Sequence, residues 1–230
     1  MIVAIHQPNF LPWLGFFHKM LVADCFVFLD DVSFSKGSFT NRVKIKTARG
    51  AEWLTVPVLT KGKSGQPISE VRCSSTVSWL AKLRKTLQLN YSSCPFWSLY
   101  EEIFYGVAAS CGGHLGALNT GLITQLATLL GIHTSVFTSC ELAPTGTGTA
   151  RLISICQELG ADVYLSGSGG RSYQEEEEFS QQGIELRYDN FEHPVYSQQF
   201  GEFIPGLSVI DLLANYGPAS GRVLECASST

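Results

Sequence analysis

Short apolar runs separated by polar residues open the chain and predict alternating strands and helices. Residues 2–5 form a first apolar run, two prolines interrupt it, and apolar residues then recur at helical spacing over 13–23. Residues 25–29 form a second apolar run, which ends in Asp30 and Asp31. A strand, a loop, a helix and a further strand together make the unit of a parallel sheet.

The middle of the chain has a different pattern. Residues 43–58 alternate between apolar and polar positions and predict a β-hairpin, and residues 68–73 indicate one more short strand. Residues 76–131 carry three apolar stripes at helical spacing and predict helices. Strands and helices alternate again afterwards, with strands over 133–137, 162–165 and 184–188 and helices over 150–159 and 209–215.

These elements predict an α/β fold with a mainly parallel central sheet, flanking helices, an inserted β-hairpin and a helical segment. We expect a single domain over residues 1–217, with the hairpin insertion at about 33–73 and the helical segment at about 76–131. For residues 218–230 we expect a disordered tail. The first residues lack the basic lead of a signal peptide, and no apolar run has the length that a membrane span requires.

Composition and charge narrow the classes of function. The hydrophobic fraction of 45% is typical of a packed globular protein, and the net charge of −4 argues against a general nucleic-acid binder. Residues 1–115 hold 12 Lys and Arg against 7 Asp and Glu, whereas residues 116–230 hold 4 against 13. Seven of the basic residues lie from Lys36 to Lys63. A local positive field beside an acidic body favours a small anionic partner over nucleic acid or a membrane, and it leaves the oligomeric state open.

The seven cysteines carry no paired CxxC spacing, so they form neither a zinc ribbon nor a disulfide framework. The pattern fits reduced thiols, and we expect a cytoplasmic protein.

Polar or glycine-rich residues follow three of the predicted strands and mark a candidate site. His6, Gln7 and Asn9 follow the first strand, the Asp30-Asp31 pair follows the second, and a Ser-Gly-Ser-Gly-Gly-Arg sequence follows residue 165. Ligands of open α/β sheets bind outside the carboxyl ends of the strands, so these groups are expected to share one cleft.

Each group in this cleft suggests a chemical role. His6 is the candidate base, and Asp30 or Asp31 would either orient it or hold Mg²⁺ together with phosphate oxygens. Backbone N–H groups of the glycine-rich loop and the guanidinium of Arg171 are suited to an anion. The candidate binding residues of this loop are Ser166, Gly167, Ser168 and Arg171. The chain has no motif for an organic cofactor, and neither a Walker nor a GxGxxG sequence is present.

Several segments are similar to the WbqC-like family. The opening IHQPNFLPWLGFF (residues 5–17) and FLDDVSFSK (28–36) carry the resemblance most clearly. Further matching segments are NRVKI (41–45), WLTVP (53–57), YLSG (164–167), Gly170, Tyr173, HPVY (193–196) and LSVIDLL (207–213). The resemblance implies a bacterial cytoplasmic protein of surface-polysaccharide or natural-product biosynthesis that adds glycyl or other acyl groups to amino-sugars. It also implies that Asn41, Arg42 and Lys44 close over an anionic substrate, and that Tyr173 and His193 contribute to binding.

Three hypotheses remain open. The first is an acyltransferase or ligase that forms an amide on an amino-sugar, a nucleotide-sugar or another anionic amine. The second is an ATP-dependent ligase or nucleotidyltransferase with an adenylating site, although the chain lacks an HxGH loop. The third is a non-catalytic ligand-binding protein.

Overall fold

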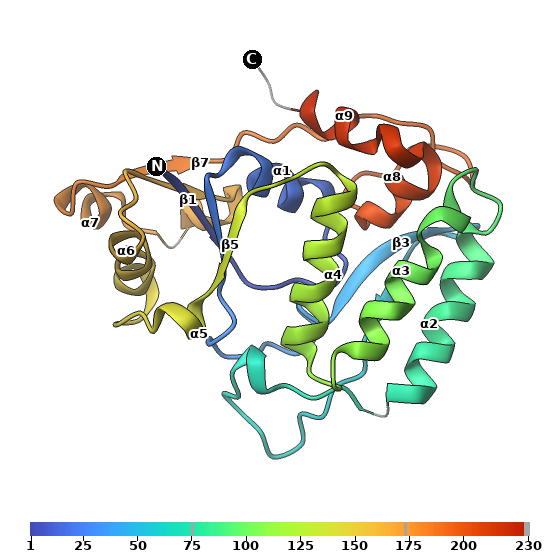
Figure 1. Cartoon of the computed structure of the whole chain (residues 1–230), viewed down its shortest axis with the longest axis horizontal. Helices are drawn as coiled ribbons and strands as arrows, with labels where there is room; N and C mark the ends of the chain where they lie inside the picture. The colour runs from blue at the N-terminus through green and yellow to red at the C-terminus, as the bar shows by residue number, and fades with distance from the viewer. Residues whose placement is uncertain (75, 173, 228–230) are drawn as a thin grey trace.

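A five-stranded parallel sheet forms the centre of the computed structural model, which describes residues 1–74, 76–172 and 174–227 (Figure 1). The strand order is β5-β2-β1-β6-β7, and each neighbouring pair is parallel. The strands are β1 (Ile2–His6), β2 (Cys25–Phe28), β5 (Ser135–Thr138), β6 (Val163–Ser166) and β7 (Glu185–Tyr188). The α/β class with a parallel central sheet is therefore confirmed.

The helices connect and cover these strands. In the described residues they are α1 (Leu14–Val22), α2 (Thr76–Tyr91), α3 (Trp97–Ser110), α4 (Leu115–Leu129), α5 (Ser139–Leu142), α6 (Gly148–Glu158), α7 (Glu176–Gln181), α8 (Val209–Tyr216) and α9 (Ser220–Glu225). Three 3₁₀ turns are η1 (Ile68–Glu70), η2 (Ser168–Ser172) and η3 (Gly217–Ala219). None of the described helices is long and apolar enough to cross a bilayer.

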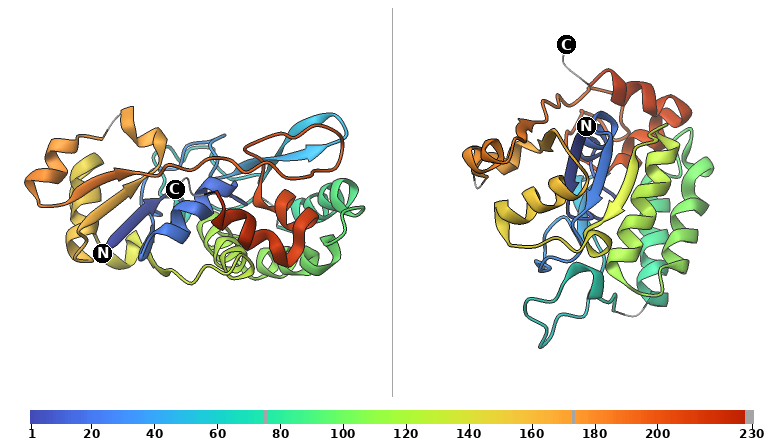
Figure 2. Two further views of the ribbon diagram at one scale, coloured as in Figure 1. Left: turned by 90° about the horizontal axis from the view of Figure 1, so that it is seen from above. Right: turned by 60° about the vertical axis from the view of Figure 1, so that its left-hand side comes forward.

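The inserted hairpin consists of β3 (Arg42–Thr47) and β4 (Gly50–Thr55), which pair with each other and not with the central sheet. Helices α2 to α4 follow it before the chain returns to the sheet at β5. In Figures 1 and 2 the hairpin lies at the opposite end of the molecule from α6 and α7.

Alternation along the strands builds two separate hydrophobic clusters. Ala4 and Phe26 belong to the cluster that contains α1, α4 and α8. Val3, Ile5 and Val27 belong to the other, against α6 and α7. Successive strand residues point to opposite faces, so apolar runs of this kind bury both faces of a sheet beneath helices.

The order of the strands reverses at β1. The chain passes from β1 to β2 and β5 on one side, and it later places β6 and β7 on the other side. The carboxyl ends of β1 and β6 therefore flank a topological switch point, which is where parallel sheets bind ligands.

Two sequence predictions differ from the structure. Residues 68–73 form the 3₁₀ turn η1 and isolated bridges instead of a strand, because Ile68 and Val71 are both buried at the spacing of a turn. The expected disordered tail contains helix α9, where Ser220 and Leu224 are buried, so this expectation was wrong for the described residues beyond 217. Residues 228–230 lie outside the described part of the chain.

Candidate functional site

A cavity of about 430 Å³ lies at the switch point between β1 and β6. Its lining combines the end of β1, helix α1, the start of α6 and the loop that follows β6. The polar lining residues include His6, Gln7, Lys19, Arg151 and Ser166. The cavity at the strand ends is thus lined by an imidazole, two basic side chains and a glycine-rich loop.

A second cavity of about 220 Å³ shares part of this lining. His6, Lys19 and Gly167 line both cavities, and Trp13 and Arg171 line only the smaller one. The two cavities therefore meet along a common wall, which we call the shared wall and define as His6, Lys19 and Gly167.

His6 forms part of the shared wall as an uncharged imidazole. Its Nδ1 lies 2.8 Å from the carbonyl oxygen of Gln7, so Nδ1 carries the hydrogen and Nε2 is left as an acceptor. Its ring packs edge-on against Phe16 at 4.9 Å. Burial, together with the charge of Lys19, lowers the pKa of His6 to about 3. Such a group accepts a hydrogen bond at neutral pH but holds a proton poorly, which weakens it as a general base.

Lys19 was not singled out by the sequence. Helix α1 is buried from Leu14 to Met20, and the side chain of Lys19 extends to the carboxyl end of β1, where Nζ donates to the carbonyl oxygen of Ile5 at 3.0 Å. Burial lowers the pKa of Lys19 to about 7, against a smaller opposing effect of Asp189. The sequence did contain a sign of this burial: apart from His18, the residues of helix α1 around Lys19 are apolar, so the helix has no polar face that could keep Lys19 in solvent.

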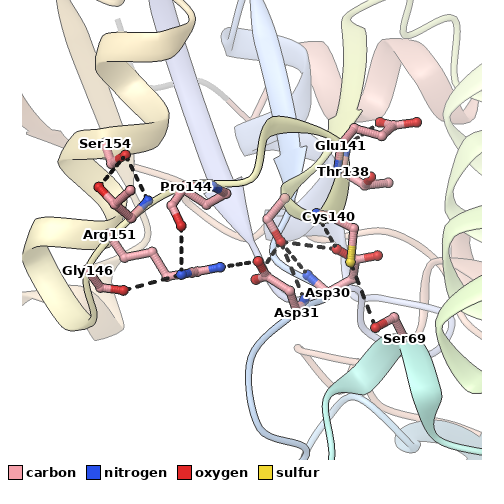
Figure 3. A network of polar contacts seen from close by, with 12 residues as sticks. Asp30, Asp31, Ser69, Thr138, Cys140, Glu141, Pro144, Gly146, Arg151 and Ser154 are labelled. Carbon is pink, nitrogen blue, oxygen red and sulfur yellow. Dashed lines mark hydrogen bonds and ion pairs between the residues drawn. The ribbon is translucent and has the colours of Figure 1, made fainter.

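Arg151 is the second cationic group that the sequence analysis missed. One Nη donates to the carbonyl oxygens of Pro144 and Gly146 at 3.1 and 3.2 Å, and the other pairs with Asp31 (Figure 3). Its Nε is buried and has no partner among the described residues, although the residue lines the larger cavity. Arg151 lies in the first turn of α6, directly after a Thr- and Gly-rich segment, and this context is typical of anion sites.

Asp30 and Asp31 do not contact His6, contrary to the sequence prediction. The Ser139 hydroxyl lies 3.0 Å from Asp30 Oδ1 and 2.7 Å from Asp31 Oδ1, and the Cys140 amide donates to Asp30 at 3.2 Å. Both carboxylates thus bind the start of α5, and Asp31 also pairs with Arg151 on α6 (Figure 3). The physical reason is that β2 lies between β1 and β5, and the segment after β5 offers N–H and O–H donors to these acids.

A metal site is not apparent around these acids. The described residues hold no group of three or more His, Cys, Asp or Glu side chains able to bind a metal ion.

The glycine-rich loop after β6 forms one side of the larger cavity. Gly167, Gly169 and Gly170 line the larger cavity and expose main chain where other residues would place side chains. Ser166 is buried beneath them, and its hydroxyl donates to the carbonyl oxygen of Gly167 at 3.2 Å.

The other candidate residues of this segment are Arg171, Ser168 and Tyr173. Arg171 lines the smaller cavity and lies 4.6 Å above the ring of Tyr188. Ser168 begins the turn η2. Tyr173 lies outside the described residues.

Four predicted binding residues lie away from both cavities. Asn9 is buried, and Asn41 is buried with its amide donating to the carbonyl oxygen of Val56. Arg42 and Lys44 lie over the Trp53 ring at 4.1 and 5.4 Å on the hairpin. The expected lid over the substrate is therefore not formed, because cation–π contacts hold these side chains on the hairpin itself.

His193 belongs to an aromatic cluster beside the smaller cavity. Its ring stacks near Trp13 at 6.4 Å and contacts Phe191, Tyr196 and Phe203. Burial lowers its pKa, and its Nε2 has no partner among the described residues. It does not line either cavity and reaches the smaller one through Trp13 and Phe191, so we assign it a packing role.

Two comparisons with known proteins give matches to this chain. Residues 7–223 match the model of the WbqC-like protein family. The chain belongs to the WbqC-like family. It is also similar to the uncharacterized protein Rv1507c of Mycobacterium tuberculosis (strain ATCC 25618 / H37Rv), with 33% identity over 217 residues that cover 94% of each chain. No solved structure matches the chain. The matched region includes the shared wall residues Lys19 and Gly167, and it begins one residue after His6.

Proposed function

We propose that this protein is a biosynthetic enzyme that forms an amide or related acyl linkage on the amine of a small anionic substrate, such as an amino-sugar nucleotide. The observation that carries the proposal is the pair of cavities that meet at the shared wall. A group-transfer reaction needs two reactants held in contact, and two adjoining cavities at a switch point provide that arrangement.

The larger cavity suits the anionic part of the substrate. Arg151 places a guanidinium there with a buried Nε that lacks a partner among the described residues, and the glycine-rich loop exposes main chain on the opposite side. Guanidinium groups and main-chain N–H groups are the usual ligands of phosphate in proteins. Asp31, Pro144 and Gly146 engage the two Nη groups of Arg151, so Nε is the guanidinium donor left for a phosphate.

The reaction balances without an oxidant or reductant. The amine nitrogen of the substrate attacks the carbonyl carbon of an activated acyl donor, a thioester or an acyl phosphate. A carbon–nitrogen bond forms, the bond from the acyl carbon to the thiolate or phosphate leaving group breaks, and the proton released by nitrogen passes to a base at the shared wall. In this proposal the main chain at Gly167, which lines both cavities, stabilises the oxyanion that develops on the acyl carbon.

A ligand screen followed by mass spectrometry tests this function. We expect UDP-linked amino-sugars to raise the melting temperature of the protein, because a ligand that binds only the folded state stabilises it. Incubation with an acyl thioester should then add the mass of the acyl group to the amino-sugar. Arg151→Met should abolish the thermal shift, whereas the matched control Arg222→Met, at an exposed position on α9, should retain it.

A different result identifies another function. An ATP-dependent ligase or nucleotidyltransferase is favoured if ATP with Mg²⁺ raises the melting temperature and amino-sugar nucleotides do not. The doubly wound sheet and the glycine-rich loop beside the cavity are the observations that support this second candidate. A non-catalytic binding protein is indicated if ligands bind but His6→Ala and wild-type protein support equal pathway output in cells.

A further inference from the structure

Two lysines are buried in this protein, and their surroundings differ. Lys46 has no exposed surface, and its Nζ donates to Gln198 Oε1 at 2.9 Å and to the carbonyl oxygens of Gly201 and Glu202. Three acceptors satisfy the three donors of an ammonium group. Lys46 is therefore a structural cation that fastens residues 198–202 to the hairpin.

Lys19 has no comparable set of partners. Its side chain is 2% exposed, and among the described residues its Nζ donates to one acceptor, the carbonyl oxygen of Ile5. Its nearest cation–π neighbour is Phe26 at 5.8 Å, which is too weak a contact to replace a counter-ion. An ammonium buried with two unused donors is costly, whereas a neutral amine in this place leaves one N–H unused and carries no charge, and it offers a lone pair.

The position of Lys19 distinguishes it from a packing residue. It lines both cavities, together with His6 and Gly167, so a group bound on either side meets its amine. The charged and titratable groups around it are His6 at the end of β1, Asp189 after β7, Arg151 on α6 and Arg171 on η2. Asp189 accepts from His18 at 2.8 Å, so its carboxylate already has a partner.

We propose that Lys19 is the proton acceptor of this site and that it is held as a free amine on the wall between the two cavities. The identity of the proton donor rests on the proposed function: Lys19 takes the proton that the attacking amine loses as the new carbon–nitrogen bond forms. Nζ becomes an ammonium in this step, and the leaving thiolate or phosphate carries the balancing negative charge.

The physical chemistry of the residue supports this role. A general base works best when its pKa lies near the operating pH, and burial lowers the pKa of Lys19 to about 7. The neighbouring His6 accepts a hydrogen bond through Nε2 but, with a pKa of about 3, binds a proton weakly. The sequence assigned the base to His6, and the structure moves this role to Lys19 while His6 orients the substrate.

The charge state of Lys19 can be measured without a substrate. The chain contains eight lysines, so protein produced with ¹³C at lysine Cε gives a resolvable set of signals. The signal that disappears in Lys19→Arg identifies Lys19, and Lys82→Arg at an exposed position of α2 provides the matched control. We expect the Lys19 signal to titrate with a midpoint near pH 7, well below the reference lysine pKa of about 10.4.

Two substitutions then separate a base from an anion-binding cation. Arginine keeps the positive charge but cannot give up its proton in proteins, whereas methionine keeps the shape and removes the amine. For a proton acceptor, Lys19→Arg and Lys19→Met should both lower kcat/KM by roughly 10²–10⁴-fold. The wild-type rate should also rise with pH through a midpoint near 7.

The outcomes distinguish the two proposals. A Lys19 signal that titrates near pH 10, or a Lys19→Arg variant that keeps activity within about threefold of the wild type, overturns the role of Lys19. If both variants fail to fold, the wild-type titration decides without an assignment: the proposal requires one of the eight lysine signals to titrate near pH 7, and the absence of such a signal overturns it. If Lys19 titrates near pH 7 but no amine is acylated, the acyl-transfer function fails while the free amine at the shared wall stands.

Discussion

The side chains around the shared wall are held by main-chain carbonyl groups and not by one another. His6 binds the carbonyl oxygen of Gln7, Lys19 that of Ile5, and Arg151 those of the loop before α6. The carbonyl groups of Ile5 and Gln7 lie at the carboxyl end of β1, and those of Pro144 and Gly146 lie in the loop between α5 and α6. Substitution of one of these residues should therefore leave the other two in position, so that single variants report on single roles.

Also at the scale of the residue, the atoms around Gly170 leave no room for a side chain. A Cβ at this position would lie 2.3 Å from Ser166 Oγ and 2.5 Å from Gln174 Oε1, and Ser166 is buried. We expect Gly170→Ala to lower the free energy of unfolding by about 1–3 kcal/mol, because overpacking forces the neighbours to shift. Chemical denaturation of this variant and of Gly169→Ala, where a Cβ meets nothing within 4 Å, measures the difference. Equal stabilities would show that the loop adapts freely to a side chain.

At the scale of elements, the buried carboxylate of Asp211 connects helix α8 to helix α2 and, through Tyr91, to strand β3. Asp211 on α8 accepts from the hydroxyl of Tyr91 on α2 at 3.3 Å, and the Tyr91 hydroxyl in turn accepts from the amide of Lys46 on β3. The other oxygen of Asp211 is buried without a hydrogen-bond partner among the described residues. Burial raises the pKa of Asp211 to about 6, against smaller opposing effects of Tyr196, Tyr91 and Lys46.

This shift predicts a pH dependence of stability with a definite sign. Because the folded state binds the proton of Asp211 more tightly than the unfolded state, the contribution is complete below about pH 4 and is lost as pH rises through 6. We expect the loss to be about 2–3 kcal/mol. Urea denaturation from pH 4 to 7 should show this decline in the wild type, and Asp211→Asn should show a smaller one. The same slope in both proteins would exclude Asp211 as its source.

At the scale of the whole molecule, the end of the chain returns to the first helix. Helix α9 lies beside α1, and a Cβ at Gly221 would approach the carbonyl oxygen of Leu130 at 2.5 Å, so the last helix also packs closely on the end of α4. Leu224 has no exposed surface and belongs to the larger hydrophobic cluster. The C-terminal residues thus cover the helices that support the site.

Leu224→Ala tests this packing. We expect a loss of about 2–4 kcal/mol in the free energy of unfolding, because the substitution removes buried methyl groups and leaves a cavity. Glu225→Ala, at an exposed position of the same helix, should change the stability by less than about 0.5 kcal/mol. Thermal unfolding of both variants decides the matter, and two unchanged melting temperatures would mean that α9 is not docked in solution.

The amino-acid sequence by itself determined the class of fold, because strands and helices are encoded by local apolar periodicity and by interrupting prolines and glycines. It also indicated that His6 and the loop after Ser166 lie side by side, since residues that end buried strands of a parallel sheet gather at one edge.

Only the tertiary structure decided which strands are neighbours and which side chains face each other. The order β5-β2-β1-β6-β7 depends on long-range packing of strands whose apolar faces are alike in sequence. It turns Asp30 and Asp31 toward α5 and away from His6. The depth of Lys19 likewise depends on how α1 is covered by elements distant in the chain, and this burial makes a common surface cation into the free amine that we propose for the site.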